Sequence, residues 1–206
     1  MIATASEVNE LKKAPEVEGV LQVILHRWSP RAFSDKDVSE KDLKSLFEAV
    51  RWTASSSNEQ PWRFLVGRRE SETFRKILGT LAPPNQLWAG KAPVLILGAT
   101  KTKFSKDSSP NRVALFDLGA ASTTLALQAA SLGLFAHQMA GFDVDAARKA
   151  FAVPEEFIFG SAIALGHQGD PASLPAEQMV KQETAPRTRK ELNEFVWAGW
   201  ETAAEL

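Results

Sequence analysis

The stretch HRWSPRAF, residues 26–33, is the most informative segment of this chain. Arg27, Ser29 and Arg31 occupy alternate positions, and Pro30 keeps the segment from being helical. Because side chains alternate between the two sides of an extended segment, these three can point the same way. Guanidinium groups match phosphate oxygens, and the hydroxyl adds a neutral donor. The stretch predicts a phosphate-binding loop, although a solvated basic surface loop would have the same composition.

A second motif, ASSSNEQPWRF, occupies residues 54–64. It follows a helical pattern over residues 38–54, in which Ser39 is a suitable N-cap and acidic side chains fall in the first turn. Residues 55–58 are also the kind of polar turn that ends a helix. We call residues 26–33 the arginine loop. One amphipathic helix is expected to join the arginine loop to a polar loop, which is followed by a strand.

Together, Arg27-x-Ser29-x-Arg31-Ala32-Phe33 and Asn58-x-Gln60-Pro61-Trp62-x-Phe64 resemble the N-terminal half of the nitroreductase family of FMN-dependent oxidoreductases. Further family-like pieces follow in the expected order, so that the resemblance runs from about residue 21 to about residue 197. These pieces are Trp88 with APVLI at 92–96, DLG at 117–119, LGL at 132–134, GFD at 141–143, AIALG at 162–166, and the pair Arg187 and Arg189.

The expected fold is α+β, with a mixed central sheet flanked by helices, as the resemblance also implies. Strands are predicted at residues 62–68, 94–99 and 157–165, and helices at 72–81 and 112–132. Gly133 is expected to end the long helix in a left-handed conformation.

The two ends of the chain are expected to lie outside this core, within a single domain over residues 1–206. An N-terminal extension of residues 1–15 precedes a predicted amphipathic helix that starts near residue 17 and ends at Ser29-Pro30. Residues 169–206 are predicted to form an extended arm followed by a C-terminal helix from about Arg189. The resemblance implies that this arm wraps a dimer partner.

Composition excludes several classes of function. The chain has 206 residues, a formal net charge of −1, no cysteine and three histidines without paired spacing. A near-neutral chain of this kind is not expected to bind nucleic acid or an anionic membrane, and no metal site is expected. The first residues lack a secretory pattern, and the apolar run at residues 113–134 is interrupted by polar residues. A cytoplasmic protein is expected.

The chain is also poor in reactive groups of its own. It contains no Gly-x-Gly-x-x-Gly, no Walker A loop and no Gly-x-Ser-x-Gly elbow. Such a profile is typical of proteins in which a bound cofactor supplies the chemistry. The resemblance implies that this cofactor is FMN. Arg27 and Ser29 would hold its 5′-phosphate, Trp28 would lie among the binding residues, and Arg187 and Arg189 would close on the same phosphate. The alternative for Arg187 and Arg189 is that they belong to a basic segment at the start of the last helix.

The resemblance assigns the flavin ring to other positions. Arg31 would lie against the N1–C2=O edge, where a fixed cation stabilises the reduced, anionic flavin and tunes the redox step. Asn58 would contact the ring with its amide, and the backbone N–H groups of Ala140 and Gly141 would face N5 and O4. His137 is left out of this set, because a lone histidine is more often packed or exposed than catalytic.

The implied activity is hydride transfer from NADH or NADPH to flavin N5 and then to a small-molecule oxidant, such as a nitroaromatic, a quinone or an enone. Two substrates that share one pocket imply ping-pong kinetics, in a homodimer with FMN at the interface. Three alternatives stay open. They are a different reaction on the same scaffold (flavin fragmentation or reductive dehalogenation), a flavin-binding protein without turnover, and an interaction module without flavin.

Overall fold

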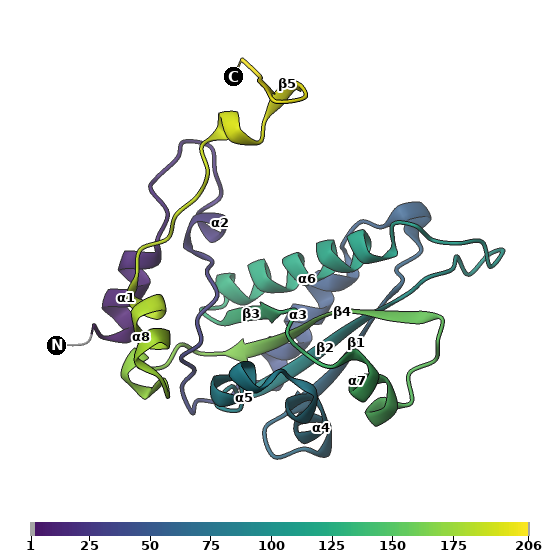
Figure 1. The fold of residues 1–206 in the computed structure, drawn as a ribbon, viewed down its shortest axis with the longest axis horizontal. Helices are drawn as coiled ribbons and strands as arrows, with labels where there is room; N and C mark the ends of the chain where they lie inside the picture. Colours follow the sequence, from purple (N-terminus) through teal and green to yellow (C-terminus); the bar gives the residue numbers. More distant parts are fainter. Residues whose placement is uncertain (1–2, 206) are drawn as a thin grey trace.

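A computed structural model describes residues 3–205, which are organised around a four-stranded sheet (Figure 1). The strand order is β1-β2-β4-β3. The strands are β1 (Trp62–Arg68), β2 (Val94–Lys101), β3 (Phe135–Met139) and β4 (Phe157–Gly166). The three runs expected as strands are confirmed, whereas β3 was not predicted. All three pairings are antiparallel, so the expected mixture of strand directions is not found in this sheet. Strand direction depends on the long connections, which a hydrophobic pattern does not specify.

Helices cover both faces of the sheet. One face carries α4 (Glu72–Thr80), α5 (Pro83–Ala89) and α7 (Val144–Phe151), and the other carries α3 (Glu40–Arg51) and α6 (Ala114–Ser131). Alternate residues of β2 supply the two cores: Leu95 and Leu97 pack with the first group of helices, and Val94 and Ile96 pack with the second. A central strand buried on both faces explains the continuous apolar run at residues 94–99.

Capping side chains, a glycine and two prolines determine where several of the helices begin or end. The Ser39 hydroxyl accepts a hydrogen bond from the Asp42 backbone N–H and caps α3, as predicted. Gly133, which follows the C-cap residue Leu132 of α6, has φ +70°, as expected for a left-handed residue that ends the helix. The capping side chain of Asp143 begins α7, a helix that was not predicted. The prolines at residues 83–84, which end α4, also occupy the first turn of α5.

The predicted helix before Pro30 is wrong in extent. Only α2 (Gln22–His26) forms, because a turn at Gly19, with φ +79°, interrupts the pattern. The apolar side chains that suggested a long helix divide into two groups. Leu25 and Trp28 are buried, whereas Val17, Leu21 and Ile24 are exposed. The periodicity therefore marks an exposed apolar surface as well as a buried one.

The N-terminal segment at α1 (Ala5–Lys12) and the C-terminal segment at α8 (Glu177–Thr184) lie side by side, whereas the C-terminus itself lies far from the N-terminus (Figure 1). The N-terminal extension contains α1, which packs against α8, a helix within the expected extended arm. The chain then continues away from the sheet, ending in a short turn and a hairpin of β5 (Trp197–Gly199) and β6 (Thr202–Ala203). The expected C-terminal helix is not formed, since the aromatic segment favours a hairpin in which Trp197 and Trp200 meet edge to face. No helix within residues 3–205 is long and apolar enough to cross a membrane.

Candidate functional site

Four predicted phosphate ligands meet in one cavity of about 250 Å³. Arg27 and Ser29 come from the loop after α2, whereas Arg187 and Arg189 come from the segment after α8. We call these four residues the phosphate cradle. Arg31 lines the same cavity. Residues far apart in the sequence therefore reach a common site, because α8 packs against α1.

The phosphate cradle has an excess of positive charge. No ion pair joins Arg27, Arg187 or Arg189 to a carboxylate within residues 3–205. Burial lowers the pKa of Arg27 and of Arg187, and the charge of nearby Arg189 lowers both pKa values further. Clustered guanidinium groups without a counterion are stabilised by a bound anion, and their planar forks suit phosphate oxygens.

Two members of the predicted set have structural partners as well. The Arg187 Nη1 atom donates to the carbonyls of Lys12, Leu25 and Arg27 at 2.8, 2.9 and 3.1 Å, so this side chain ties the loop to the C-terminal segment. Its buried Nε has no hydrogen-bond partner among the described residues. The indole N–H of Trp28 donates to Asn9, and the ring packs beneath Lys12. Trp28 thus forms part of the cavity wall.

β3, at the edge of the sheet, contacts the arginine loop through the side chain of His137. The His137 Nδ1 atom lies 2.9 Å from the Pro30 carbonyl oxygen, which can only accept, so Nδ1 carries the proton. The imidazole also packs against Trp88, with ring centroids 4.6 Å apart. Burial lowers the pKa of His137 to about 4, so the ring is neutral near pH 7. His137 is a packed side chain that holds the loop.

The backbone predicted to face the flavin follows the other end of β3. Ala140 and Gly141 come directly after Met139, and α5 begins beside them, because the Ala82 N–H and the Asn85 Nδ2 both donate to the Gly141 carbonyl. A Cβ at Gly141 would lie 2.8 Å from Asn85 Nδ2, so glycine permits this close approach. Asn85 was not among the predicted site residues. Its polar amide beside two prolines at a helix start was the available signal.

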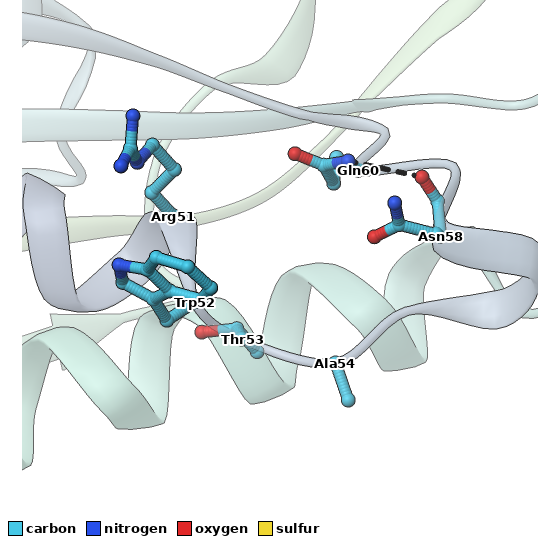
Figure 2. A pocket seen from close by; sticks show the side chains of 6 residues that line it. All are labelled: Arg51, Trp52, Thr53, Ala54, Asn58 and Gln60. Carbon is cyan, nitrogen blue, oxygen red and sulfur yellow. Dashed lines mark hydrogen bonds between the residues drawn. The ribbon is translucent and has the colours of Figure 1, made fainter.

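Asn58 lies elsewhere. It lines a separate cavity with Arg51, Trp52 and Gln60, in which the Gln60 side chain donates to the Asn58 carbonyl at 3.1 Å (Figure 2). This loop precedes β1, next to the start of β4, whereas the arginine loop pairs with the chain just after β4 ends. The two loops are therefore separated by the length of β4, roughly 30 Å for its 10 residues at 3.3 Å per residue. One copy of the chain does not bring Asn58 to the phosphate cradle.

The Asn58 loop is strained and strongly held. Ser57, Asn58 and Gln60 have φ values of 53°, 53° and 50°, in the left-handed region that costs about 1 kcal/mol or more for most residues. The buried carboxylate of Asp117 accepts from the Ser56 N–H at 3.3 Å. Strain of this kind, kept in place by surrounding contacts, is concentrated at functional sites.

Glu59, next to Asn58, holds a second loop. Its carboxylate accepts from the backbone N–H and the hydroxyl of Ser105, at 3.0 and 2.6 Å, and these hydrogen bonds lower the pKa of Glu59. The polar segment at residues 101–111 forms a small hairpin closed by a bridge between Lys103 and Pro110. Within the part of the chain that the structure describes, no three His, Asp or Glu side chains are grouped to hold a metal ion.

Comparison with known proteins identifies the family to which the chain belongs. The sequence profile described as the nitroreductase family matches residues 24–167. A Mycolicibacterium smegmatis protein described as an uncharacterized 15.4 kDa protein is 37% identical over 145 residues, which are 66% of this chain and 95% of that protein.

Two solved structures share the fold over almost the whole chain. A crystal structure described as an oxidoreductase containing FMN has a TM-score of 0.84 and 31% identity, covering 90% of this chain and 94% of that one. A Desulfovibrio desulfuricans protein solved in complex with FMN has a TM-score of 0.68 and 26% identity, covering 88% and 96% of the two chains. The profile match over residues 24–167 establishes that this chain belongs to the nitroreductase family.

Proposed function

We propose that this chain is an FMN-dependent oxidoreductase that takes hydride from NADH or NADPH and passes it to a small oxidant such as a nitroaromatic compound, a quinone or an enone. The observation that carries the proposal is the phosphate cradle, in which Arg27, Arg187 and Arg189 meet without an ion pair to any described carboxylate. A phosphate dianion would supply the missing negative charge. When bound, FMN would supply the redox chemistry.

The chain's own residues would bind and orient this cofactor. The phosphate cradle would hold the 5′-phosphate, and Arg31, on the same cavity wall, would place a cation beside the ring. Backbone N–H groups at Ala140 and Gly141, beyond the far end of β3, would face the opposite part of the ring. This order along β3 suits a ligand with a phosphate at one end and a planar ring at the other.

We place the cofactor at the interface of a homodimer. The separation of Asn58 from the phosphate cradle within one chain supports this arrangement, since a second copy could bring its own Asn58 to the ring. Exposed apolar side chains are consistent with a large interface: Phe116 on α6 is 77% exposed and Trp200 in the C-terminal hairpin is 85% exposed. The C-terminal arm would wrap the second copy.

An absorbance spectrum of the purified protein, followed by anaerobic addition of NADH and then NADPH, tests the proposal. We expect flavin bands that bleach with at least one donor. A yellow protein that does not bleach with either donor would instead be a flavin-binding protein without turnover. A protein that shows no flavin bands after incubation with FMN and removal of the unbound FMN would overturn the proposed function.

A further inference from the structure

Glu183, on α8, is a buried carboxylate that the proposed function does not use. It is 1% exposed, and burial raises its pKa. A buried charge persists only when it is well hydrogen-bonded. No described cation forms an ion pair with Glu183 within 4.0 Å. Its partners are backbone groups instead.

Those backbone groups belong to the arginine loop. The Arg31 N–H donates to both oxygens of Glu183, at 2.9 and 3.0 Å, and the Ala32 N–H donates to Oε1 at 3.0 Å. The carbonyl of Pro30, directly before Arg31, is held by His137. The backbone at Arg31 is thus fixed from two sides, by α8 and by β3.

The Arg31 side chain has no comparable support. Its guanidinium makes no hydrogen bond to any described residue, although the N–H of the same residue makes two. The position of this guanidinium in the cavity therefore depends on its backbone. Glu183 is the side chain that accepts the hydrogen bonds from the backbone N–H groups of Arg31 and Ala32.

Hydrogen bonds from Lys12 and Arg187 hold α8, the helix that carries Glu183, and the segment that follows it. Lys12 of α1 donates through Nζ to the carbonyls of Gln182 and Ala185, at 3.1 and 2.6 Å. Arg187 donates to the carbonyls of Lys12, Leu25 and Arg27. A displacement of α8 would therefore be resisted, which is what a fixed support for the loop requires.

We propose that Glu183 is a positioning residue that sets the place of the Arg31 guanidinium against the flavin. This inference rests on the proposed function, because it takes Arg31 as the cation beside the ring. Glu183 lines the same cavity as the phosphate cradle, but its two oxygens accept from the backbone N–H groups of Arg31 and Ala32, which occupy them. It would act mainly through the backbone of Arg31 and Ala32, while its carboxylate also interacts with the charge of Arg31.

The variant Glu183→Asp tests positioning separately from charge. Aspartate keeps the negative charge but is one methylene shorter, so it cannot reach both N–H groups from α8 in its present place. We expect FMN to bind about tenfold more weakly, as for the loss of a hydrogen bond to a charged group, and the bound flavin to become harder to reduce. A dissociation constant and a midpoint potential equal to those of the unchanged protein would overturn the inference.

The matched control is Glu177→Asp on the same helix. Glu177 is exposed and pairs with Lys181 at 2.7 Å, so the same chemical change should leave both measurements unchanged. A double variant, Arg31→Ala with Glu183→Asp, locates the effect. If Glu183 acts through Arg31, the additional shift of the midpoint potential disappears in the Arg31→Ala background. A shift of the same size in that background would overturn the assignment.

A measurement on the protein without cofactor separates this inference from the proposed function. Amide hydrogen exchange at Arg31 and Ala32 should be at least tenfold faster in Glu183→Asp than in Glu177→Asp, because the acceptor has been withdrawn. Unchanged exchange would overturn the inference even if FMN binds. If the unchanged protein binds no FMN, the proposed function fails while the exchange result still decides whether Glu183 holds the loop.

Should Glu183→Asp not fold, Glu183→Met replaces it, because methionine keeps the length of the side chain but removes the oxygens that accept from the Arg31 and Ala32 N–H groups. Loss of a nearby negative charge alone would make the flavin easier to reduce, whereas a displaced Arg31 would make it harder to reduce. A midpoint potential below that of the unchanged protein supports positioning. An unchanged or raised potential would overturn it.

Discussion

The role of Arg27 in binding an anion is indicated both by its neighbours in the sequence and by its contacts in the folded chain. Its place two residues before Ser29, in a segment kept extended by Pro30, suggested an anion-binding role. In the folded chain the two side chains are in contact, with Nη1 3.3 Å from the Ser29 hydroxyl, and Arg189 lies near enough to lower the pKa of Arg27. The guanidinium is therefore held ready for an anion without a carboxylate partner.

Replacing Arg27 should weaken cofactor binding. We expect Arg27→Ala to reduce FMN affinity by about 1.5–3 kcal/mol, the usual contribution of a hydrogen bond to a charged group. Isothermal titration of FMN into the cofactor-free protein measures this change. Arg75→Ala, an exposed position on α4, is the control and should bind FMN like the unchanged protein. Equal affinity in both variants would remove Arg27 from the phosphate cradle.

Arg31 should affect reduction more than binding. We expect Arg31→Ala to lower the midpoint potential of the bound flavin, because a cation beside the ring stabilises the negative charge of the reduced form. Arg31→Lys keeps the charge and should retain most of the potential. Spectroelectrochemical titration of the three proteins measures the effect. A potential unaltered in Arg31→Ala would contradict the tuning role.

At the scale of elements, the short strand β3 supports the arginine loop, although its sequence pattern was too weak to predict a strand. The strand was not predicted, because five residues with one partly buried histidine carry little periodic signal. Pairing with β4 nevertheless fixes His137 beneath Pro30. The missed strand therefore carries a contact that holds the arginine loop.

This contact predicts a pH dependence of stability. His137 has its pKa lowered from 6.5 to about 4 in the folded chain, so between these values the unfolded chain binds a proton that the folded chain does not. Stability should fall as pH decreases through this window, by up to about 3 kcal/mol from this residue. Urea unfolding of the unchanged protein and of His137→Gln across the window measures it.

His137→Gln should show a smaller loss of stability on acidification, while near pH 7 it keeps a donor for the Pro30 carbonyl. The pKa of His167 is also lowered, chiefly by burial, so some dependence on pH should persist in the variant. Identical pH profiles for the two proteins would contradict the assignment of a buried, neutral His137.

Other elements show which local signals were sufficient. Serine and glycine at the ends of α3 and α6 had defined capping roles, and the apolar run of β2 required burial on both faces. The pattern before Pro30 was misleading, because exposed and buried apolar residues have the same periodicity in sequence. The C-terminal segment was misleading because Trp197 and Trp200 can meet in a hairpin as readily as on a helix.

At the scale of the whole molecule, three features are consistent with the proposed homodimer. Asn58 lies in a cavity away from the phosphate cradle, and the C-terminal hairpin extends away from the sheet (Figure 1). Phe116, on the first turn of α6, is among the most exposed apolar side chains. A second copy would account for all three features.

A charge placed in the proposed interface should separate the copies. We expect the unchanged protein to have the mass of a dimer by light scattering and Phe116→Glu to shift toward the monomer, with weaker FMN binding. Val144→Glu is the matched control: it is also an exposed apolar position, 44% exposed, but on α7 at the other face of the sheet. A dimer undisturbed by Phe116→Glu, or disrupted equally by Val144→Glu, would contradict this interface.

The sequence by itself determined the chemistry that each segment could offer. The alternation around Pro30 indicated an anion-binding loop, capping residues marked helix ends, and ordered motifs indicated the nitroreductase family, because these signals depend on neighbouring residues.

Only the tertiary structure decided which segments meet. It joined Arg27 to Arg187, placed Glu183 against the N–H of a residue 152 positions away, and separated Asn58 from them. Such contacts follow from packing two chain ends and two layers of helices around one sheet. No local periodicity records that arrangement.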